Sequence, residues 1–440
     1  MTIQQMFFGS GSSVTFTALV AQLSQTSVSL SAAGVARDGT SIYATGVDTT
    51  NRSFTLAKIS STGTLTWQRK LSLTGATDIN VSSKGFPQNC VADTSGNVYF
   101  VGWFDTSSGV RETVLAKYNS SGTIQWQRKI LGPANISSVG EVIAIDSTGA
   151  NVFISCIYQR SGSSASAILK YNSSGVIQWQ RTLYTGSSNN VQASNITIDS
   201  SDNVFVGGSE SVSGSVRGFI AKYNSAGTLQ WQQYVSYASQ ANVRYIWIDS
   251  SGNLYCGGSP WLMKFNSTGT VQFGYNYSNG NYGTFGMVFD TTTDTIWGNY
   301  NNGTNSAFFS QFDSSGNNTS TNQIQLAGSL SGPNSGAGAF GDTGFYLMCA
   351  SAFSSSTSTG QIGVWRLPTN MSSTTTTSIS LTTWSQLQYI TATAASTSAA
   401  SGLTSGANSM TDDVVTMVDA AGAYTDAAGT LTLSSGTWTN

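Results

Sequence analysis

Aspartate is the residue whose type and spacing in this 440-residue sequence could do chemistry. Two carboxylates suffice for glycoside hydrolysis, whereas a calcium site needs several converging oxygen ligands. One aspartate recurs every 41 to 55 residues, which distributes the carboxylates one to a unit and singles out no catalytic pair. We therefore interpret this set as residues that form hairpin turns, because Asp side chains fold back onto their own backbone. The set is Asp38, Asp93, Asp146, Asp199, Asp249, Asp290 and Asp342.

Other chemical groups are scarce. Histidine, the commonest general base and metal ligand, is absent. The three glutamates, Glu112, Glu141 and Glu210, have no repeated partner. The four cysteines are Cys90, Cys156, Cys256 and Cys349; with no close pair among them, we expect isolated buried thiols rather than disulfides or a zinc site. From these residues we expect no enzyme activity, no metal and no cofactor.

Charge excludes a further class of function. Only 38 of the 440 residues are charged (18 Lys and Arg, 20 Asp and Glu), and the net charge is -2. Nucleic-acid binding rests on clustered Lys and Arg, so a nucleic-acid partner is not expected. The aromatic content of 11% argues against a disordered chain.

A tryptophan motif repeats along the chain. One copy reads Leu-Ala-Lys-Tyr-Asn-Ser-Ser-Gly-Thr-Ile-Gln-Trp-Gln-Arg-Lys over residues 115–129, and close copies span 56–70, 169–181 and 220–232. A later copy at 263–273 ends in Phe. We expect these aromatic anchors to act as wedges that fill the interface between adjacent sheets, and burying such a ring fully is worth about 2–3 kcal/mol. The anchors are Trp67, Trp126, Trp179, Trp231 and Phe273.

Each unit contains four short runs rich in Val, Ile, Tyr, Phe and Trp, separated by turns such as Asp-Ser-Thr-Gly and Asn-Ser-Ser-Gly. Four strands repeated at about 50 residues are typical of a β-propeller. The sequence thus predicts an all-β fold, a seven-bladed β-propeller with four-stranded blades. Eleven of the 18 basic residues occupy repeat positions, among them Lys58, Lys117 and Lys170, and we expect edge charges that discourage sheet aggregation.

Three segments are predicted: an N-terminal arm at 1–13, the propeller at 14–385 and a Ser/Thr/Ala-rich C-terminal extension at 386–440 that acts as a docking or strap segment. Either residues 378–384 or residues 14–19 close the last blade. Residues 410–421 combine helical spacing with a strand-like run, which leaves helix or strand open. Residues 430–433 and 437–439 predict a terminal hairpin.

These motifs resemble the SBBP and PQQ-like propeller repeats: Asp249 to Tyr255 is similar to the first hairpin of an SBBP repeat, and Lys117 to Trp126 to the tryptophan-docking strand of PQQ-like blades. The resemblance implies fold and leaves function open. A PQQ dehydrogenase would also need a vicinal cysteine pair and a route to the periplasm. The sequence has no adjacent cysteines, and its N-terminus has no signal-peptide pattern.

The opening, residues 1–11, resembles the starts of structural proteins of tailed phages, particularly those of marine bacteria, which share this charge-poor composition. This resemblance implies a non-enzymatic virion protein, tail- or fibre-associated, that takes part in host-surface attachment. Its expected partners are other virion proteins and a host polysaccharide or outer-membrane protein, with no membrane insertion and with oligomers in the particle. The alternatives are a capsid-surface decoration protein and, in another class, a bacterial carbohydrate-binding or hydrolytic propeller.

Overall fold

The structure is a computed structural model. It describes residues 6–8, 12–14, 20–24, 30–50, 52–60, 64–72, 76–80, 89–160, 162–184, 189–212, 214–236, 242–258, 261–277, 283–290, 295–301, 307–315, 322–327, 337–342, 345–353, 360–368, 378–381, 385–391, 398–400, 404–407, 411–413, 418–421, 425–428, 432–435 and 438–439. Side chains are described for most of these residues between 34 and 274, and for 313–315.

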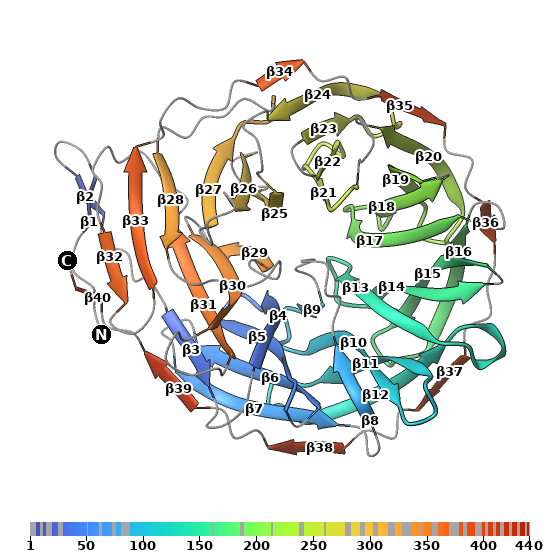
Figure 1. Ribbon diagram of the computed structural model, residues 1–440, viewed down its shortest axis with the longest axis horizontal. Helices are drawn as coiled ribbons and strands as arrows, with labels where there is room; N and C mark the ends of the chain where they lie inside the picture. Colours follow the sequence, from blue (N-terminus) through green and yellow to red (C-terminus); the bar gives the residue numbers. More distant parts are fainter. Residues whose placement is uncertain are drawn as a thin grey trace.

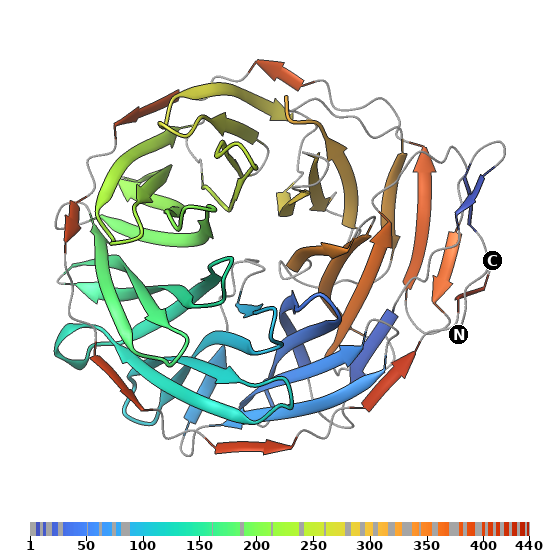
Figure 2. The ribbon, with the colours of Figure 1, turned by 180° about the vertical axis from the view of Figure 1, so that it is seen from behind.

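Antiparallel sheets stand in a ring (Figures 1 and 2). In the described ranges, seven sheets contribute to the ring, and each contacts the next through one strand. These strands are β4 (Leu30–Arg37), β9 (Cys90–Ala92), β13 (Ser138–Ile145), β17 (Asn190–Ile198), β21 (Tyr245–Ile248), β25 (Gly283–Asp290) and β29 (Ala337–Asp342), and β29 contacts β4. A further hairpin, β1 (Met6–Phe8) with β2 (Ser12–Val14), lies outside the ring, and all of its residues except Val14 belong to the range predicted as an N-terminal arm. The predicted all-β class is confirmed.

The first five sheets follow the chain. The first contains β4 (Leu30–Arg37), β5 (Ser41–Asp48), β6 (Ser53–Ser60) and β7 (Leu65–Ser72). The second contains β8 (Ala76–Asn80), β9 (Cys90–Ala92), β10 (Val98–Thr106), β11 (Arg111–Tyr118) and β12 (Ile124–Leu131). A short 3-10 helix, η1 (Pro133–Asn135), leads to the third, with β13 (Ser138–Ile145), β14 (Asn151–Arg160), β15 (Ser163–Asn172) and β16 (Ile177–Tyr184). The fourth contains β17 (Asn190–Ile198), β18 (Val204–Val212), β19 (Ser215–Tyr223) and β20 (Leu229–Ser236). The fifth contains β21 (Tyr245–Ile248), β22 (Leu254–Gly258), β23 (Trp261–Phe265) and β24 (Val271–Tyr277).

The sixth and seventh sheets combine distant parts of the chain. The sixth joins β25 (Gly283–Asp290), β26 (Thr295–Asn301), β27 (Ala307–Phe312) and β28 (Asn322–Ala327) to β33 (Ser385–Thr391) and β32 (Ser378–Leu381). The seventh contains β29 (Ala337–Asp342), β30 (Phe345–Phe353) and β31 (Gly360–Pro368). Its next strand is β3 (Val20–Ser24), which pairs with β31, so an N-terminal strand just after residues 14–19 completes this sheet. Residues 378–381 pair with β33 instead.

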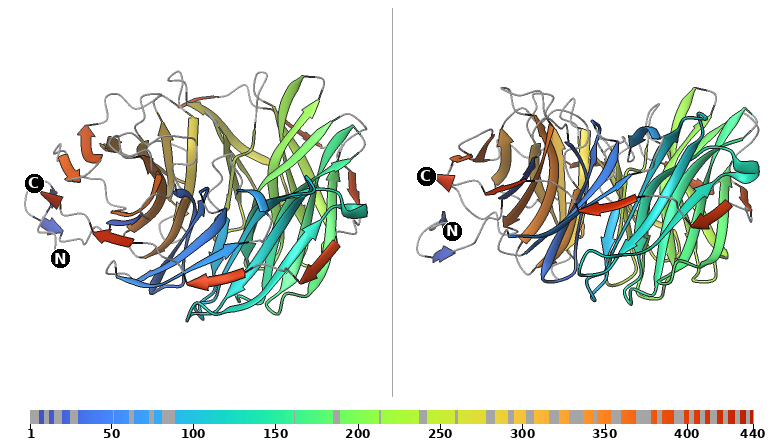
Figure 3. Two further views of the ribbon diagram at one scale, coloured as in Figure 1. Left: turned by 60° about the horizontal axis from the view of Figure 1, so that its bottom comes forward. Right: turned by 90° about the horizontal axis from the view of Figure 1, so that it is seen from below.

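The C-terminal segment encircles the ring as a belt, a name we use for β34–β40. Its strands are β34 (Ser398–Ala400), β35 (Thr404–Ala407), β36 (Thr411–Asp413), β37 (Val418–Ala421), β38 (Thr425–Ala428), β39 (Thr432–Ser435) and β40 (Trp438–Thr439). They add to the fifth, fourth, third, second, first, seventh and sixth sheets in turn, against the order of the sheets in the chain. Figure 3 shows them on the outside of the ring.

The belt changes three expectations. The strands encoded by each repeat number four in several sheets, as predicted, and the belt supplies a fifth. Within 410–421 the described residues form β36 and β37, which answers the choice between helix and strand. The predicted terminal hairpin is wrong, because β39 pairs with β3 and β40 pairs with β32 on a different sheet.

The hydrophobic core lies between neighbouring sheets rather than within any one of them. One buried cluster joins the first and second sheets and includes Leu71, Phe54 and Phe100, and similar clusters join the next three pairs. Each sheet therefore depends on its neighbours for burial of its faces, as expected for repeat folds. Among the described residues, no helix has the length and apolar character to cross a membrane.

Candidate functional site at the junctions between sheets

The tryptophan anchors lie on the outer strands that the repeats encode, and each reaches the next sheet. The indole Nε1 donates a hydrogen bond to the main-chain oxygen of a serine in the neighbouring turn. The pairs are Trp67 with Ser120 at 2.9 Å, Trp126 with Ser173 at 3.0 Å, Trp179 with Ser225 at 3.1 Å and Trp231 with Ser267 at 3.4 Å. These rings are half-buried, and the wedge interpretation stays a prediction.

A lysine donates to the same oxygen atom in each junction. The Nζ–O distances are 3.2 Å for Lys58, 3.0 Å for Lys117, 3.2 Å for Lys170 and 3.2 Å for Lys222. Each Nζ also lies 4.9–5.4 Å from the centre of an aromatic ring of its own sheet, a cation–π geometry. The expectation that these repeat lysines are edge charges is wrong, because they link sheets.

A glycine makes room for each tryptophan. In the Asn-Ser-Ser-Gly turn, Gly175 has φ +76°, and a Cβ added there would lie 2.7 Å from the Trp126 ring. Gly122, Gly227 and Gly269 repeat this arrangement at 2.8–2.9 Å from the tryptophan of the preceding sheet. The turn therefore needs glycine for two reasons, the left-handed backbone and the close ring.

The fifth sheet replaces tryptophan with Phe273, which has no N–H group. There the hydroxyl of Tyr255 donates to the main-chain oxygen of Ser314 at 3.2 Å, and Lys264 donates to the same atom at 3.3 Å. The acceptor position thus keeps two donors although its usual indole is missing.

The carboxylates of the described repeat aspartates accept hydrogen bonds within their own turns. Oδ1 of Asp93 accepts hydrogen bonds from the backbone N–H of Ser95 and Asn97, and Oδ2 accepts one from the Asn97 side chain. Asp199 and Asp249 repeat this pattern, and Asp38 and Asp146 form related turns. The side chains of Asp290 and Asp342 lie outside the described residues.

The environment favours the ionised form of two of these aspartates. Burial acts to raise the pKa of Asp38, but hydrogen bonds from Thr40, Tyr43 and Ser41 outweigh it and hold this pKa below its usual value. The same balance, with donors around Asn151, lowers the pKa of Asp146. A carboxyl group with a lowered pKa is a poor general acid near neutral pH.

Other buried carboxylates are paired with cations. Oδ2 of Asp48 lies 2.9 Å from Nζ of Lys70, Glu112 Oε1 lies 2.6 Å from Lys129 Nζ, and Glu210 forms two hydrogen bonds with Arg217. In the part of the chain with described side chains, no group of three His, Cys, Asp or Glu residues could hold a metal ion.

Three of the predicted isolated thiols are free and buried: Cys90, Cys156 and Cys256. Burial raises the pKa of Cys90 and of Cys156 to about 12 and also raises that of Cys256. Thiolates, the nucleophilic form, are therefore suppressed at all three. The side chain of Cys349 lies outside the described residues.

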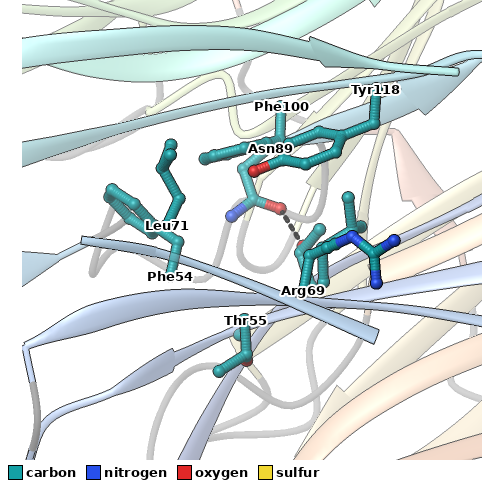
Figure 4. Close-up of a pocket in the computed structure, with 10 residues that line it drawn as sticks. Phe54, Thr55, Arg69, Leu71, Asn89, Phe100 and Tyr118 are labelled. Carbon is teal, nitrogen blue, oxygen red and sulfur yellow. Dashed lines mark hydrogen bonds between the residues drawn. The ribbon is translucent and has the colours of Figure 1, made fainter. Parts of the chain in front are cut away.

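A small cavity lies between the first and second sheets (Figure 4). Its empty volume of about 250 Å³, which includes open solvent, is below the roughly 300–1,000 Å³ of small-molecule sites. Asn89 Oδ1 is 3.0 Å from the Thr45 hydroxyl there, whereas Asn89 Nδ2 and Thr55 Oγ1 are buried without a hydrogen-bond partner. These three residues come together at one junction, so no repeated motif in the sequence predicts the cavity.

Comparison with known proteins places these features in a class. The family model described as SBBP, Beta-propeller repeat, matches residues 180–209, which run from β16 into β18. The predicted SBBP-type repeat is confirmed over this stretch. Comparison with curated proteins gives no match.

Several solved structures are similar to this chain at low identity. The Dos1 propeller is 11% identical, with 76% of this chain and 77% of that chain covered and a TM-score of 0.46. The periplasmic gluconolactonase PpgL of Pseudomonas aeruginosa is 12% identical, with 83% and 99% covered and a TM-score of 0.45. Sqt1 from Chaetomium thermophilum is 10% identical, with 79% and 100% covered and a TM-score of 0.40. The described chain is all-β, and it contains a β-propeller repeat at residues 180–209. Activity does not follow from such matches.

Proposed function

We propose that this chain is a seven-bladed, non-enzymatic β-propeller that serves as a structural protein of a phage particle. It sits at the tail or its fibres and contributes to host attachment. Seven sheets among the described residues, each contacting the next around a closed ring, support the blade number. The resemblance of residues 1–11 to phage structural proteins supports the assignment of the chain to a phage particle.

The belt is the main observation that supports a structural role for this chain. An exposed sheet edge is a template for pairing with other chains, and in the described ranges a belt strand adds to every sheet of the ring. The N-terminal strand β3 and the belt strand β39 lie side by side in the seventh sheet. A ring fastened from both ends of the chain suits a protein that has to persist outside a cell, because opening it requires several strands to leave together.

The use of the carboxylates supports a non-enzymatic role. The five repeat aspartates with described side chains are acceptors in their own turns, and Asp48, Glu112 and Glu210 are paired with Lys or Arg. Because only 9% of the residues in the chain are charged, the partners we expect are neutral ones: a host polysaccharide or an outer-membrane protein, together with other virion proteins.

Mass spectrometry and immunogold microscopy of purified particles test this proposal. We expect the chain at a fixed copy number, with gold label on the tail or fibres. Absence of the chain from the particles would overturn the virion role. Gold label over the capsid would overturn the attachment role and indicate a capsid-surface decoration protein instead. Release of reducing sugar from a glycan panel by the purified protein, lost on an Asp→Asn change, would overturn the non-enzymatic role.

A further inference from the structure

The belt has a repeat of its own, with a period of seven residues. Five of its strands begin at Thr404, Thr411, Val418, Thr425 and Thr432, each seven residues after the last. Each strand adds to a different sheet, so seven residues of belt correspond to one step around the ring.

The register is the same on successive sheets. The second residue of each belt strand lies opposite the core residue four positions after the tryptophan. These pairs are Asp426 with Leu71, Asp419 with Ile130, Asp412 with Leu183 and Ser405 with Val235. On the fifth sheet Ser398 lies opposite Tyr277, four residues after Phe273.

Charge on the belt matches charge on the outer strands. Two positions before each core residue stand Arg69, Arg128 and Arg181 on the first, second and third sheets, where the belt residue is Asp. The fourth and fifth sheets have Gln233 and Tyr275 at this position, and there the belt residue is Ser. Acidic residues occur at this belt position on the sheets that present arginine.

Sheet geometry brings the two kinds of residue within reach. Directly opposite residues share a face, and the residue two positions away on the partner strand is a diagonal neighbour at about 7–8 Å, within reach of a long side chain. Nε of Arg69 donates to the main-chain oxygen of Gly122 at 2.6 Å, and Nε of Arg128 to that of Gly175 at 2.8 Å. These two arginines are thus held beside the outer edge that the belt covers.

We propose that Asp412, Asp419 and Asp426 fix the register of the belt by pairing with Arg181, Arg128 and Arg69. A shift of the belt by one repeat would keep a belt strand on the first four sheets but would place one aspartate on a sheet without arginine. The same shift would place an uncharged residue, Ser405 or Leu433, opposite one of the three arginine-bearing strands. The three charged pairs therefore distinguish one register from its seven-residue neighbours.

Hydrogen–deuterium exchange of the full chain, followed by mass spectrometry, tests this assignment. We expect Asp412→Asn to speed amide exchange of β36 about 1.5- to 5-fold at low salt, the size of effect a surface ion pair produces, and the effect to vanish at about 1 M salt. The matched control is Asp413→Asn, which lies opposite Thr182 on the other face. Equal exchange in both variants would overturn the proposal.

A transplanted pair gives a second, independent readout. On the fourth sheet, Ser405→Asp combined with Gln233→Arg is expected to slow exchange of β35 about 3-fold, while Ser405→Asp alone is not. If Ser405→Asp changes the exchange of β35 equally with and without Gln233→Arg, the aspartate does not pair with the arginine and the proposal fails. Neither result depends on where the protein resides, so it stays distinct from the virion role.

Discussion

The indole Nε1 of Trp126 donates a hydrogen bond to the main-chain oxygen of Ser173, 3.0 Å away on the next sheet. Lys117 Nζ lies 3.0 Å from the same oxygen. One carbonyl therefore accepts two donors from the neighbouring sheet, and the same arrangement recurs at the junctions formed by Trp67, Trp179 and Trp231. The junction joins the sheets through a main-chain atom of the turn, so this contact does not use the Ser side chain.

Trp126→Phe tests the hydrogen bond. The substitution removes the N–H group and keeps an aromatic ring, so we expect the free energy of unfolding to fall by about 1 kcal/mol. Urea unfolding followed by circular dichroism measures it. An unchanged midpoint would mean that Lys117 alone satisfies the Ser173 oxygen.

Gly175→Ala tests the close approach of the ring. The new Cβ would lie 2.7 Å from Trp126 on a backbone with φ +76°. The control is Gly214→Ala, with φ +83° and no atom within 4 Å of its Cβ. Both variants suffer backbone strain of about 1 kcal/mol, and we expect Gly175→Ala to lose about 1–3 kcal/mol more. Equal losses in thermal unfolding would contradict a tight junction.

Two threonines at the cavity between the first and second sheets should respond in opposite ways. The hydroxyl of Thr45 lies 3.0 Å from Asn89 Oδ1, so Thr45→Val strands a buried polar atom and should cost about 1–3 kcal/mol. Thr55 Oγ1 is buried without a hydrogen-bond partner, so Thr55→Val should leave stability unchanged or raise it. Denaturation midpoints of the two variants, compared side by side, provide the test; the reverse order would show that the Thr55 hydroxyl is satisfied.

Acid should loosen the turns. The pKa of Asp38 and that of Asp146 are lowered in the folded chain from the ordinary value of 3.8. The unfolded chain thus binds protons first as the pH falls below about 4. The stability these two carboxylates provide is complete above that pH and is lost as the pH falls through their folded pKa values. Melting temperatures between pH 7 and pH 2 measure this loss, and Asp146→Asn should flatten the decline.

Thiol reagents report on the core. Because burial raises the pKa of Cys90 and Cys156 to about 12, these thiols should react with a disulfide reagent at pH 8 far more slowly than free cysteine, and at ordinary rates after unfolding in urea. Fast reaction of either thiol in the native chain would show that the junction beside it opens readily.

The sequence predicted the repeats more fully than the junctions. The Asp and Trp motifs located strands and turns because their chemistry is local, and the free, buried state of Cys90, Cys156 and Cys256 follows from their isolation in the sequence. The role of Lys117 depends on a carbonyl 56 residues away, and no local pattern encodes such a distance. The hydrogen bond between Thr45 and Asn89 joins two sheets, and no repeated motif marks it in the sequence.

The belt was visible in the sequence but ambiguous. Met410, Val414, Met417 and Ala421 fit helical spacing, and a period of seven residues is also close to two helical turns. Pattern alone therefore could not distinguish a helix from a strand that steps from one sheet to the next. The outer edges of the sheets, which are made by other segments, decide the outcome.

The reversed path of the belt has a consequence for synthesis. A ribosome makes β7, β12, β16, β20 and β24 long before it makes the strands that pair with them. The nascent chain thus carries several unpaired edges at once, the condition under which neighbouring chains on one messenger join wrongly. The belt then reaches the fifth sheet first and the first sheet only with its fifth strand, so β7, made first of these five edges, remains unpaired by the belt for the longest stretch of synthesis.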